Sequence, residues 1–258
     1  MNRISKAFEN KKAVIAFVTG GDPDLETTEA LIPEMAAAGA DLIEIGIPFS
    51  DPIAEGVLIQ EADERALRAG TTTDKLFEMV KRVRNKVNIP LVFVTYMNPV
   101  YTYGTERFAK MCAECGIDGV VIPDVPFEEK GEVSEACESA GIELISIVVP
   151  SAKNRLGMIA NEAGGFLYCA ASNSKISDVE KMINKIKKVS DIPCAVGYSI
   201  STPEQAQEAT QYSDGAIIKS SIVSLVAKYG KECIAPVCDF VREIKEAVMV
   251  NMEVKASA

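Results

Sequence analysis

Glu44 is the residue whose surroundings most clearly indicate chemistry. It lies within the segment DLIEIGIP (41–48), where Leu42, Ile43 and Ile45 are its apolar neighbours. Burying a carboxylate among such side chains is costly, so desolvation raises the pKa of the group toward neutrality, where it can serve as a general acid and base. A solvated strand end or a lysine partner would explain the residue without catalysis. Because inward-facing strand positions are rarely acidic, we predict a catalytic role for Glu44.

A second carboxyl group follows in the loop FSDPIAEG (49–56). This loop carries Asp51 and Glu55, and Pro52 stiffens it. Glu44 and Glu55 come from one strand and the loop after it, so both could face the same ligand. Ser50, Asp51 and Pro52 are also ordinary turn residues, and turn formation explains the loop equally well.

The composition of the 258 residues excludes several kinds of site. The chain has no histidine, which excludes Ser-His-Asp catalysis and histidine-ligated zinc. Lys and Arg number 27 against 37 Asp and Glu, and the net charge of −10 argues against nucleic-acid binding. Cys112 and Cys115 form a Cys-x-x-Cys pair that no second pair completes, so we expect no metal and assign both thiols to a helix core.

The seven cysteines, an odd number without a secretory signal, predict reduced thiols and a cytoplasmic protein. Residues 1–12 lack the apolar segment of a signal peptide, and no apolar run approaches the ~18 residues of a membrane span. We therefore expect no contact with a membrane.

Eight short apolar runs alternate with amphipathic segments along the whole chain. They are apolar almost continuously, which is typical of strands that are buried on both faces of a parallel sheet. Eight strand–helix units in this length predict one (β/α)8 TIM barrel over residues 1–258, with a frayed tail after about residue 249. A doubly wound open sheet is the alternative. The predicted strands are Ala13–Thr19, Asp41–Pro48, Pro90–Tyr96, Gly119–Pro123, Glu143–Pro150, Phe166–Ala171, Pro193–Ser199 and Gly215–Lys219.

Helix boundaries are marked by capping residues and glycines. Ser177 with Glu180 and Thr202 with Gln205 match the capping-box pattern that opens a helix. Four glycines close helical patterns shortly before a strand, where a left-handed residue is expected. They are Gly39, Gly116, Gly141 and Gly164.

A TIM barrel places its site at the carboxyl ends of the strands, with phosphate bound by the loops after strands 7 and 8. Here these loops read VGYSISTPEQ (196–205) and GAIIKSSIV (215–223). Gly197, Ser199, Ser220 and Ser221 offer close backbone approach and hydroxyl groups, and Lys219 adds a positive charge. Two capped helices without a ligand are the alternative.

Five segments together resemble the tryptophan synthase alpha subunit family over essentially the whole chain. E-I-G-I-P-F-S-D-P (44–52) is the most specific of the matching sequences. The segments are AFVTGGDPD (16–24), AGADLIEIGIPFSDPIAEG (38–56), VTYMNPVYTYG (94–104), VIPDVPFEE (121–129) and GYSISTPEQ (197–205).

The resemblance implies a TIM-barrel lyase that cleaves indole-3-glycerol phosphate to indole and glyceraldehyde 3-phosphate without cofactor or metal. It also implies a pyridoxal-phosphate beta subunit as partner. By the resemblance, Glu44 is the acid–base glutamate that protonates the ring carbon, and Tyr168 lies beside it. The other implied positions are Phe17, Ile59 and Tyr96 around the indole, Gly197, Tyr198, Ser199, Lys219 and Ser220 at the phosphate, and Pro48, Asp51 and Asp124 at the partner surface.

The chain departs from the family pattern in three places. Glu55 stands where the family has Asp, and one methylene moves the carboxylate by about 1.5 Å, a scale at which misplacement costs roughly a hundredfold in rate. The lid loop after strand 6, AASNSKIS (170–177), is shorter than in the family and lacks its threonine, which should lower turnover. The phosphate loops read Gly197-Tyr198-Ser199 and Lys219-Ser220 in place of Gly-Phe-Gly and Gly-Ser.

These departures leave two alternatives to an active lyase. One is a homologue with little or no lyase activity that binds or regulates a beta subunit. The other is an enzyme of the same fold that acts on another phosphorylated ligand.

Overall fold

A closed parallel barrel forms the centre of the computed structural model, which describes residues 2–171, 175–197 and 200–256. The strands pair in sequence order, and β1 pairs with β8, which confirms the barrel and rules out the open sheet. Each strand is shorter than or equal to its predicted run. The strands are β1 (Ala13–Thr19), β2 (Leu42–Gly46), β3 (Leu91–Val94), β4 (Gly119–Val121), β5 (Glu143–Val148), β6 (Leu167–Ala170), β7 (Cys194–Gly197) and β8 (Gly215–Ile218).

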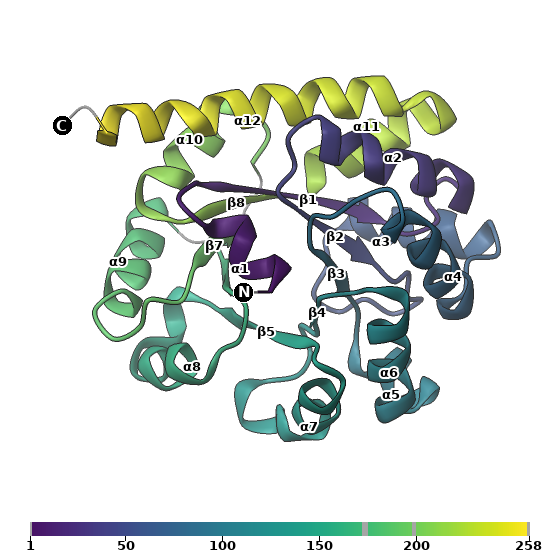
Figure 1. The fold of residues 1–258 in the computed structure, drawn as a ribbon, viewed down its shortest axis with the longest axis horizontal. Coiled ribbons are helices and arrows are strands. Elements are labelled where there is room, and N and C mark those ends of the chain that lie inside the picture. Colours follow the sequence, from purple (N-terminus) through teal and green to yellow (C-terminus); the bar gives the residue numbers. More distant parts are fainter. Residues whose placement is uncertain (1, 172–174, 198–199, 257–258) are drawn as a thin grey trace.

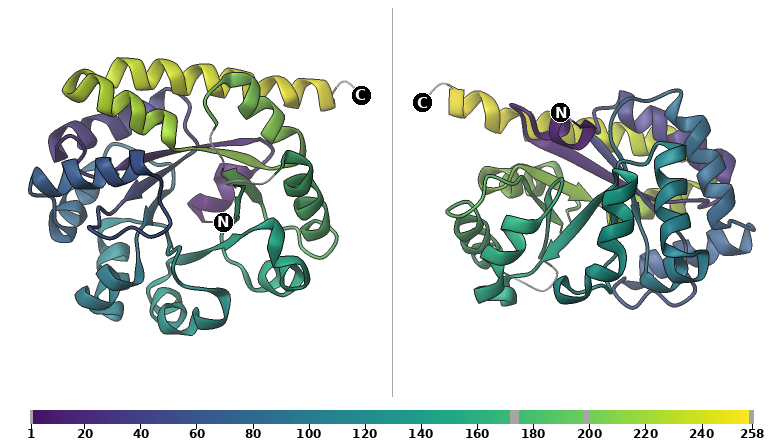
Figure 2. Two further views of the ribbon diagram at one scale, coloured as in Figure 1. Left: turned by 180° about the vertical axis from the view of Figure 1, so that it is seen from behind. Right: turned by 60° about the horizontal axis from the view of Figure 1, so that its bottom comes forward.

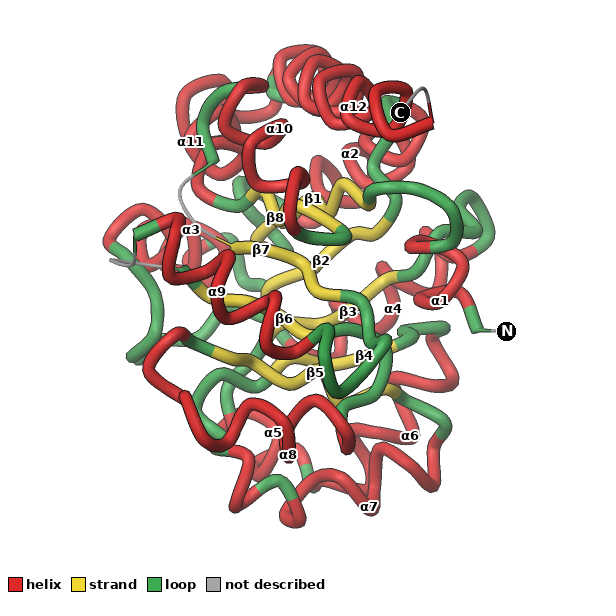
Figure 3. The backbone as a smooth tube through the Cα atoms, turned by 90° about the vertical axis from the view of Figure 1, so that its left-hand side faces the viewer, coloured by secondary structure: helices red, strands yellow, loops and turns green. Residues whose placement is uncertain are grey.

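Helices surround the barrel on its outer face (Figures 1 and 3). Those after the first strand are α2 (Leu25–Ala37), α3 (Val57–Arg68), α4 (Thr73–Arg84), α5 (Met97–Tyr103), α6 (Thr105–Cys115), α7 (Gly131–Ala140), α8 (Leu156–Glu162), α9 (Ile176–Ile186), α10 (Pro203–Tyr212), α11 (Ser220–Tyr229) and α12 (Ile234–Ala256). Helix α1 (Arg3–Phe8) precedes β1, and three 3₁₀ segments are η1 (Phe127–Glu129), η2 (Pro150–Arg155) and η3 (Gly230–Glu232). Within the described residues, none of the helices combines the length and the apolarity that crossing a membrane requires.

Local sequence sets most of the helix boundaries. The Thr202 hydroxyl accepts a hydrogen bond from the backbone N–H of Gln205, and Pro203 is the first helical residue, as predicted. The capping box at Ser177 is wrong, because α9 begins two residues earlier than this box requires, and its N-cap, Lys175, makes no side-chain bond. The Lys175 carbonyl instead accepts from the N–H of Asp178, an acidic residue that suits the positive end of the helix dipole.

Glycines end two helices in the predicted left-handed conformation, Gly116 after α6 and Gly141 after α7. Gly39 also has a positive φ. The prediction for Gly164 is wrong, since α8 ends at Glu162 and the positive φ belongs to Gly165. A Cβ on Gly164 would lie 2.2 Å from Oε2 of Glu143, the end of a flexible side chain.

The final helix continues past the point where the sequence predicted a frayed tail. Helix α12 packs along α10, α11 and α2, and it extends beyond the barrel to Ala256 (Figure 2). Val241, Ile244 and Val248 lie on one helical face and are fully buried, which explains why the segment is helical.

Along each strand, successive side chains point alternately toward the outer helices and into the barrel interior. Ile43 and Ile45 belong to the large cluster between strands and helices, whereas Phe17 and Val92 belong to the interior cluster. Glu44 is in register with Phe17 on β1 and Val92 on β3. The pleat therefore directs Glu44 into the barrel.

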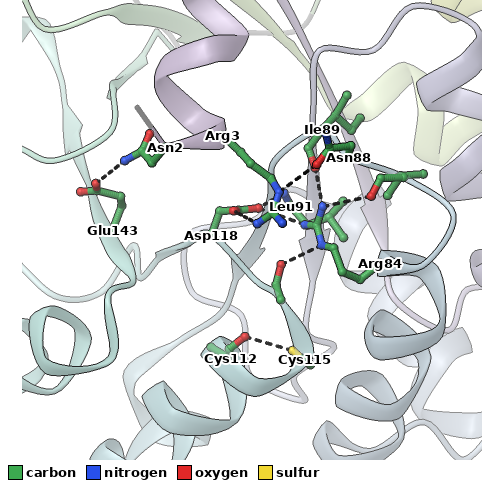
Figure 4. A network of polar contacts seen from close by, with 12 residues as sticks. Asn2, Arg3, Arg84, Asn88, Ile89, Leu91, Cys112, Cys115, Asp118 and Glu143 are labelled. Carbon is green, nitrogen blue, oxygen red and sulfur yellow. Dashed lines mark hydrogen bonds and ion pairs between the residues drawn. The ribbon is translucent and has the colours of Figure 1, made fainter.

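An ionic network closes the amino end of the barrel (Figure 4). Asp118, just before β4, accepts hydrogen bonds from the guanidinium groups of Arg3 and Arg84, each at 3.0 Å, and from the N–H of Leu91 at 2.9 Å. Glu143, the first residue of β5, accepts from the Asn2 amide at 2.8 Å. These contacts tie α1 and its N-cap to the starts of β3, β4 and β5.

Candidate active site

A cavity of about 590 Å³ opens at the carboxyl ends of the strands. Six predicted site residues line it, and they come from β6, β7, α3, the loop before α3 and the β8–α11 junction. These six are Glu55, Ile59, Tyr168, Gly197, Lys219 and Ser220.

Glu44 lies in the barrel interior and has no exposed surface. Neither of its carboxylate oxygens has a hydrogen-bond partner among the described residues. Burial raises the pKa of Glu44 from 4.5 to about 7, an effect that the nearby Lys219 charge opposes and the Glu55 charge reinforces. At neutral pH this carboxyl group can therefore both donate and accept a proton.

Glu55 and Lys219 form an ion pair across the cavity. The Lys219 ammonium contacts Oε1 of Glu55, and both side chains are mostly buried. The same ammonium lies 4.3 Å from the centre of the Phe17 ring, within cation–π distance. Three predicted site residues from three parts of the chain thus meet at one point.

Tyr168 and Gly197 form one wall of the cavity on neighbouring strands. A Cβ on Gly197 would lie 2.6 Å from a ring carbon of Tyr168 and 2.7 Å from its hydroxyl oxygen, so only glycine leaves room for this ring. Burial, followed by the charges of Glu44 and Glu55, raises the pKa of Tyr168 well above its usual value. The phenol therefore stays protonated.

Tyr96 contacts the loop that carries Glu55. Its hydroxyl oxygen accepts a hydrogen bond of 3.0 Å from the N–H of Ala54, and its ring centre is 5.6 Å from that of Phe49. Tyr96 therefore holds loop 49–56, and the cavity lining does not include it.

Asp63 is a buried carboxyl group in the site region that the sequence analysis did not identify. Burial, followed by the charge of Glu55, raises the pKa of Asp63 to about 7, while a hydrogen bond from the Phe49 backbone opposes the rise. The available signal is spacing, because Asp63 lies four residues after Ile59 and three before Ala66, on the buried face of α3.

The three residues predicted for a partner surface differ in exposure. Asp51 is exposed, Asp124 is half-buried and Pro48 is buried. Both carboxylate oxygens of Asp124 accept from the N–H of Met97, at 2.9 and 3.1 Å, so this carboxylate caps α5.

Tyr198 and Ser199, predicted at the phosphate, lie outside the described residues, as do residues 172–174 of the predicted lid.

Comparisons with known proteins agree over nearly the whole chain. The family model described as "Tryptophan synthase alpha chain" matches residues 4–249. The tryptophan synthase alpha chain of Lacticaseibacillus casei is 38% identical and covers 98% of each chain. That of Geobacter sp. (strain M21) is 39% identical over 96% of this chain and 98% of the relative.

Solved structures give the same result. Tryptophan synthase subunit alpha from Legionella pneumophila superposes with a TM-score of 0.91 at 32% identity, covering 97% of this chain and 99% of that one. A chain of tryptophan synthase from M. tuberculosis, in an aminoacrylate-bound form, superposes with a TM-score of 0.87 at 30% identity, covering 96% and 100%.

Proposed function

Because the chain belongs to the tryptophan synthase alpha chain family, we propose that it carries out the family's lyase reaction in the cavity at the carboxyl ends of the strands. That reaction cleaves indole-3-glycerol phosphate to indole and glyceraldehyde 3-phosphate. The observation that carries the proposal is the buried carboxyl group of Glu44, which has no hydrogen-bond partner among the described residues and lies within electrostatic range of Lys219 and Glu55 in the cavity lining.

Glu44 acts first as an acid and then as a base. The protonated carboxyl donates its proton to the indole carbon that bears the glycerol phosphate chain, so that this carbon becomes tetrahedral. The resulting carboxylate then takes the proton of the adjacent side-chain hydroxyl while the carbon–carbon bond breaks. The hydroxyl carbon becomes the aldehyde of glyceraldehyde 3-phosphate, and Glu44 is protonated again. A pKa of about 7 suits both steps at neutral pH.

Glu55 takes and returns the proton of the indole ring nitrogen. Its carboxylate accepts the N–H proton as the ring carbon is protonated, and returns it when the bonding electrons flow back into the indole. Loop 49–56 brings Glu55 to the cavity, and the hydrogen bond from Ala54 to Tyr96 holds this loop in place. Glu55 stands where the family has Asp, and its side chain is longer. The position of loop 49–56 and the length of this side chain together determine how close the carboxylate comes to the indole N–H.

The phosphate binds where α11 begins. Ser220 is the first residue of this ten-residue helix, and the N–H groups of a first helical turn together with the helix dipole favour an anion at this position. Lys219 and Gly197 line the same part of the cavity, and we include Tyr198 and Ser199 in this subsite on the family pattern.

Apolar side chains hold the indole between the two carboxyl groups. Ile59 and Tyr168 line the cavity, and Phe17 lies beneath Lys219. Burial of an aromatic ring against such surfaces stabilises the complex by about 25 cal/mol per Å² of apolar area.

A tryptophan synthase beta subunit is the partner we assign to the loops around the cavity. Asp51 is exposed there, and Ile53 in the same loop is 81% exposed, a large apolar side chain available for contact. Pro48 and Asp124 shape the same rim. All seven cysteines are free thiols, which fits a reducing compartment such as the cytoplasm.

The test is indole release from indole-3-glycerol phosphate by the purified chain, alone and with a tryptophan synthase beta subunit. We expect release that increases with the beta subunit. No release under either condition from folded protein would contradict the lyase assignment.

A second candidate function is a beta-subunit-binding homologue with little or no lyase activity. The Glu55–Lys219 ion pair favours it, because the pair neutralises the second carboxyl group. Stimulation of the beta subunit without indole release would support this alternative.

A further inference from the structure

Lys219 occupies two places that the proposed function needs for the substrate. Its ammonium is paired with Glu55, the carboxylate assigned to the indole N–H. It also lies 4.3 Å from the centre of the Phe17 ring, where the flat indole ring would pack. The substrate therefore cannot take its place until Lys219 moves.

Lys219 also has the charge that the other end of the substrate requires. It is the one positively charged side chain among the described residues that line the cavity. A phosphate monoester carries a charge of about −1.5 to −2 at neutral pH. Glu44, Glu55 and Asp63 already supply carboxyl groups to this region, so a phosphate needs Lys219 as its counter-ion.

The geometry allows one ammonium group to serve either anion. Lys219 immediately precedes Ser220, the first residue of α11, so its backbone lies at the phosphate subsite. Its four-carbon side chain reaches from there to Glu55 and is flexible. Rotation of this side chain alone can transfer the ammonium from the carboxylate to a phosphate at the helix terminus.

We propose that Lys219 is a specificity-determining residue, which shields Glu55 and the Phe17 ring in the free protein and moves to the phosphate when substrate binds. The inference rests on the proposed function, because it assigns the phosphate to the start of α11. An indole compound that lacks a phosphate displaces Lys219 only at the cost of its contacts with Glu55 and Phe17, whereas one with a phosphate provides the ammonium with a new partner.

The exchange prepares both carboxyl groups for the reaction. Glu55 loses its cation and becomes free to accept the indole N–H. The Lys219 charge lowers the pKa of Glu44 in the free protein, so its movement away favours the protonated form of Glu44 that donates the proton. Phosphate binding is thereby coupled to indole binding, to the release of Glu55 from its ion pair and to the protonation of Glu44.

Calorimetric titration of the full chain tests this coupling without relying on turnover. Indole is titrated in the absence and presence of saturating glycerol 3-phosphate, which supplies the phosphate. We expect glycerol 3-phosphate to tighten indole binding by about fivefold or more, the lower range of typical coupling between two sites. In Lys219→Met, indole binds more tightly than in the wild type, and the effect of glycerol 3-phosphate on indole binding disappears.

Two further variants control the interpretation. Lys219→Arg keeps the charge and retains the coupling. Lys231→Met removes an equal charge from an exposed side chain that pairs with Asp24, and it leaves the coupling unchanged. Thermal unfolding midpoints equal to that of the wild type establish that the variants are folded. If Lys219→Met does not fold, Lys219→Gln is measured in its place.

Two results would overturn the proposal: absence of coupling in the wild type, or the same coupling in Lys219→Met or its Gln replacement. Failure of the proposed function gives a different pattern, in which the wild type releases no indole from indole-3-glycerol phosphate yet still shows the coupling.

Discussion

Replacement of Glu44 by Gln separates the catalytic role of the carboxyl group from the cost of burying it. Gln keeps the shape of the side chain and can neither give nor take a proton. Loss of a positioned general acid and base typically costs about 10²–10⁴ in rate. We therefore expect indole release by Glu44→Gln to fall at least about a hundredfold, with the fold intact.

The same variant has a pH-dependent effect on stability that follows from the pKa of Glu44. The rise from 4.5 to about 7 corresponds to roughly 3 kcal/mol, at about 1.4 kcal/mol for each pKa unit. The folded protein binds this proton more tightly than the unfolded chain. The Glu44 contribution is therefore fully present below pH 4.5 and is lost as the pH rises through about 7.

Urea unfolding followed by circular dichroism measures this contribution in both proteins between about pH 4.5 and 8. The free energy of unfolding of the wild type should fall relative to that of Glu44→Gln by roughly 3 kcal/mol over this range. Asp63 titrates in both proteins, so its contribution cancels in the difference. Glu114→Gln, which changes an exposed carboxylate on α6, should show no such trend.

Two results would contradict these expectations for Glu44. If the difference in the free energy of unfolding between the wild type and Glu44→Gln does not change with pH, burial does not raise the pKa of Glu44. Unchanged turnover in Glu44→Gln would remove the residue from the reaction.

Other perturbations test neighbouring parts of the site. The kcat/KM of the wild type for indole-3-glycerol phosphate should fall as the pH rises through about 7, where Glu44 loses its proton, and a flat profile would contradict this. Gly197→Ala places a Cβ 2.6 Å from the Tyr168 ring, so thermal unfolding should show a loss of about 1–3 kcal/mol and substrate titration a higher KM. Asp22→Asn removes the charge that pairs with Arg65 through two contacts of 2.8 Å. Because the Arg65 side chain is 32% exposed, urea unfolding should show a loss of about 1–3 kcal/mol, whereas wild-type stability would show that the pair contributes little.

Much of the fold could be predicted because the strands carry an unambiguous pattern. Strands β1 and β2 are buried at every position, so their sequences are apolar on both faces and are easily found. The interior position of Glu44 followed from the same pattern, because it is the charged residue inside such a run. The start of α9 was harder, since Ser177 and Glu180 match a capping box that the chain does not use.

Contacts between distant residues could not be predicted in this way. Glu55 and Lys219 are 164 residues apart, and their meeting depends on barrel closure and on the exact lengths of both side chains. Asp63 lies in an ordinary amphipathic helix, where a carboxyl group is usually solvated. Its spacing from Ile59 indicates the face of α3 on which it lies, and the packing of α3 shows that this face is buried.

The network around Asp118 also determines how the barrel opens. Arg3 and Arg84 fasten the amino ends of the strands, at the opposite end from the cavity. The loops at the cavity end can consequently fluctuate while the strand ends stay joined, because local opening is least costly where fewest buried contacts are lost. In hydrogen–deuterium exchange, the amides of β3 and β4 should therefore exchange more slowly than those of loop 49–56.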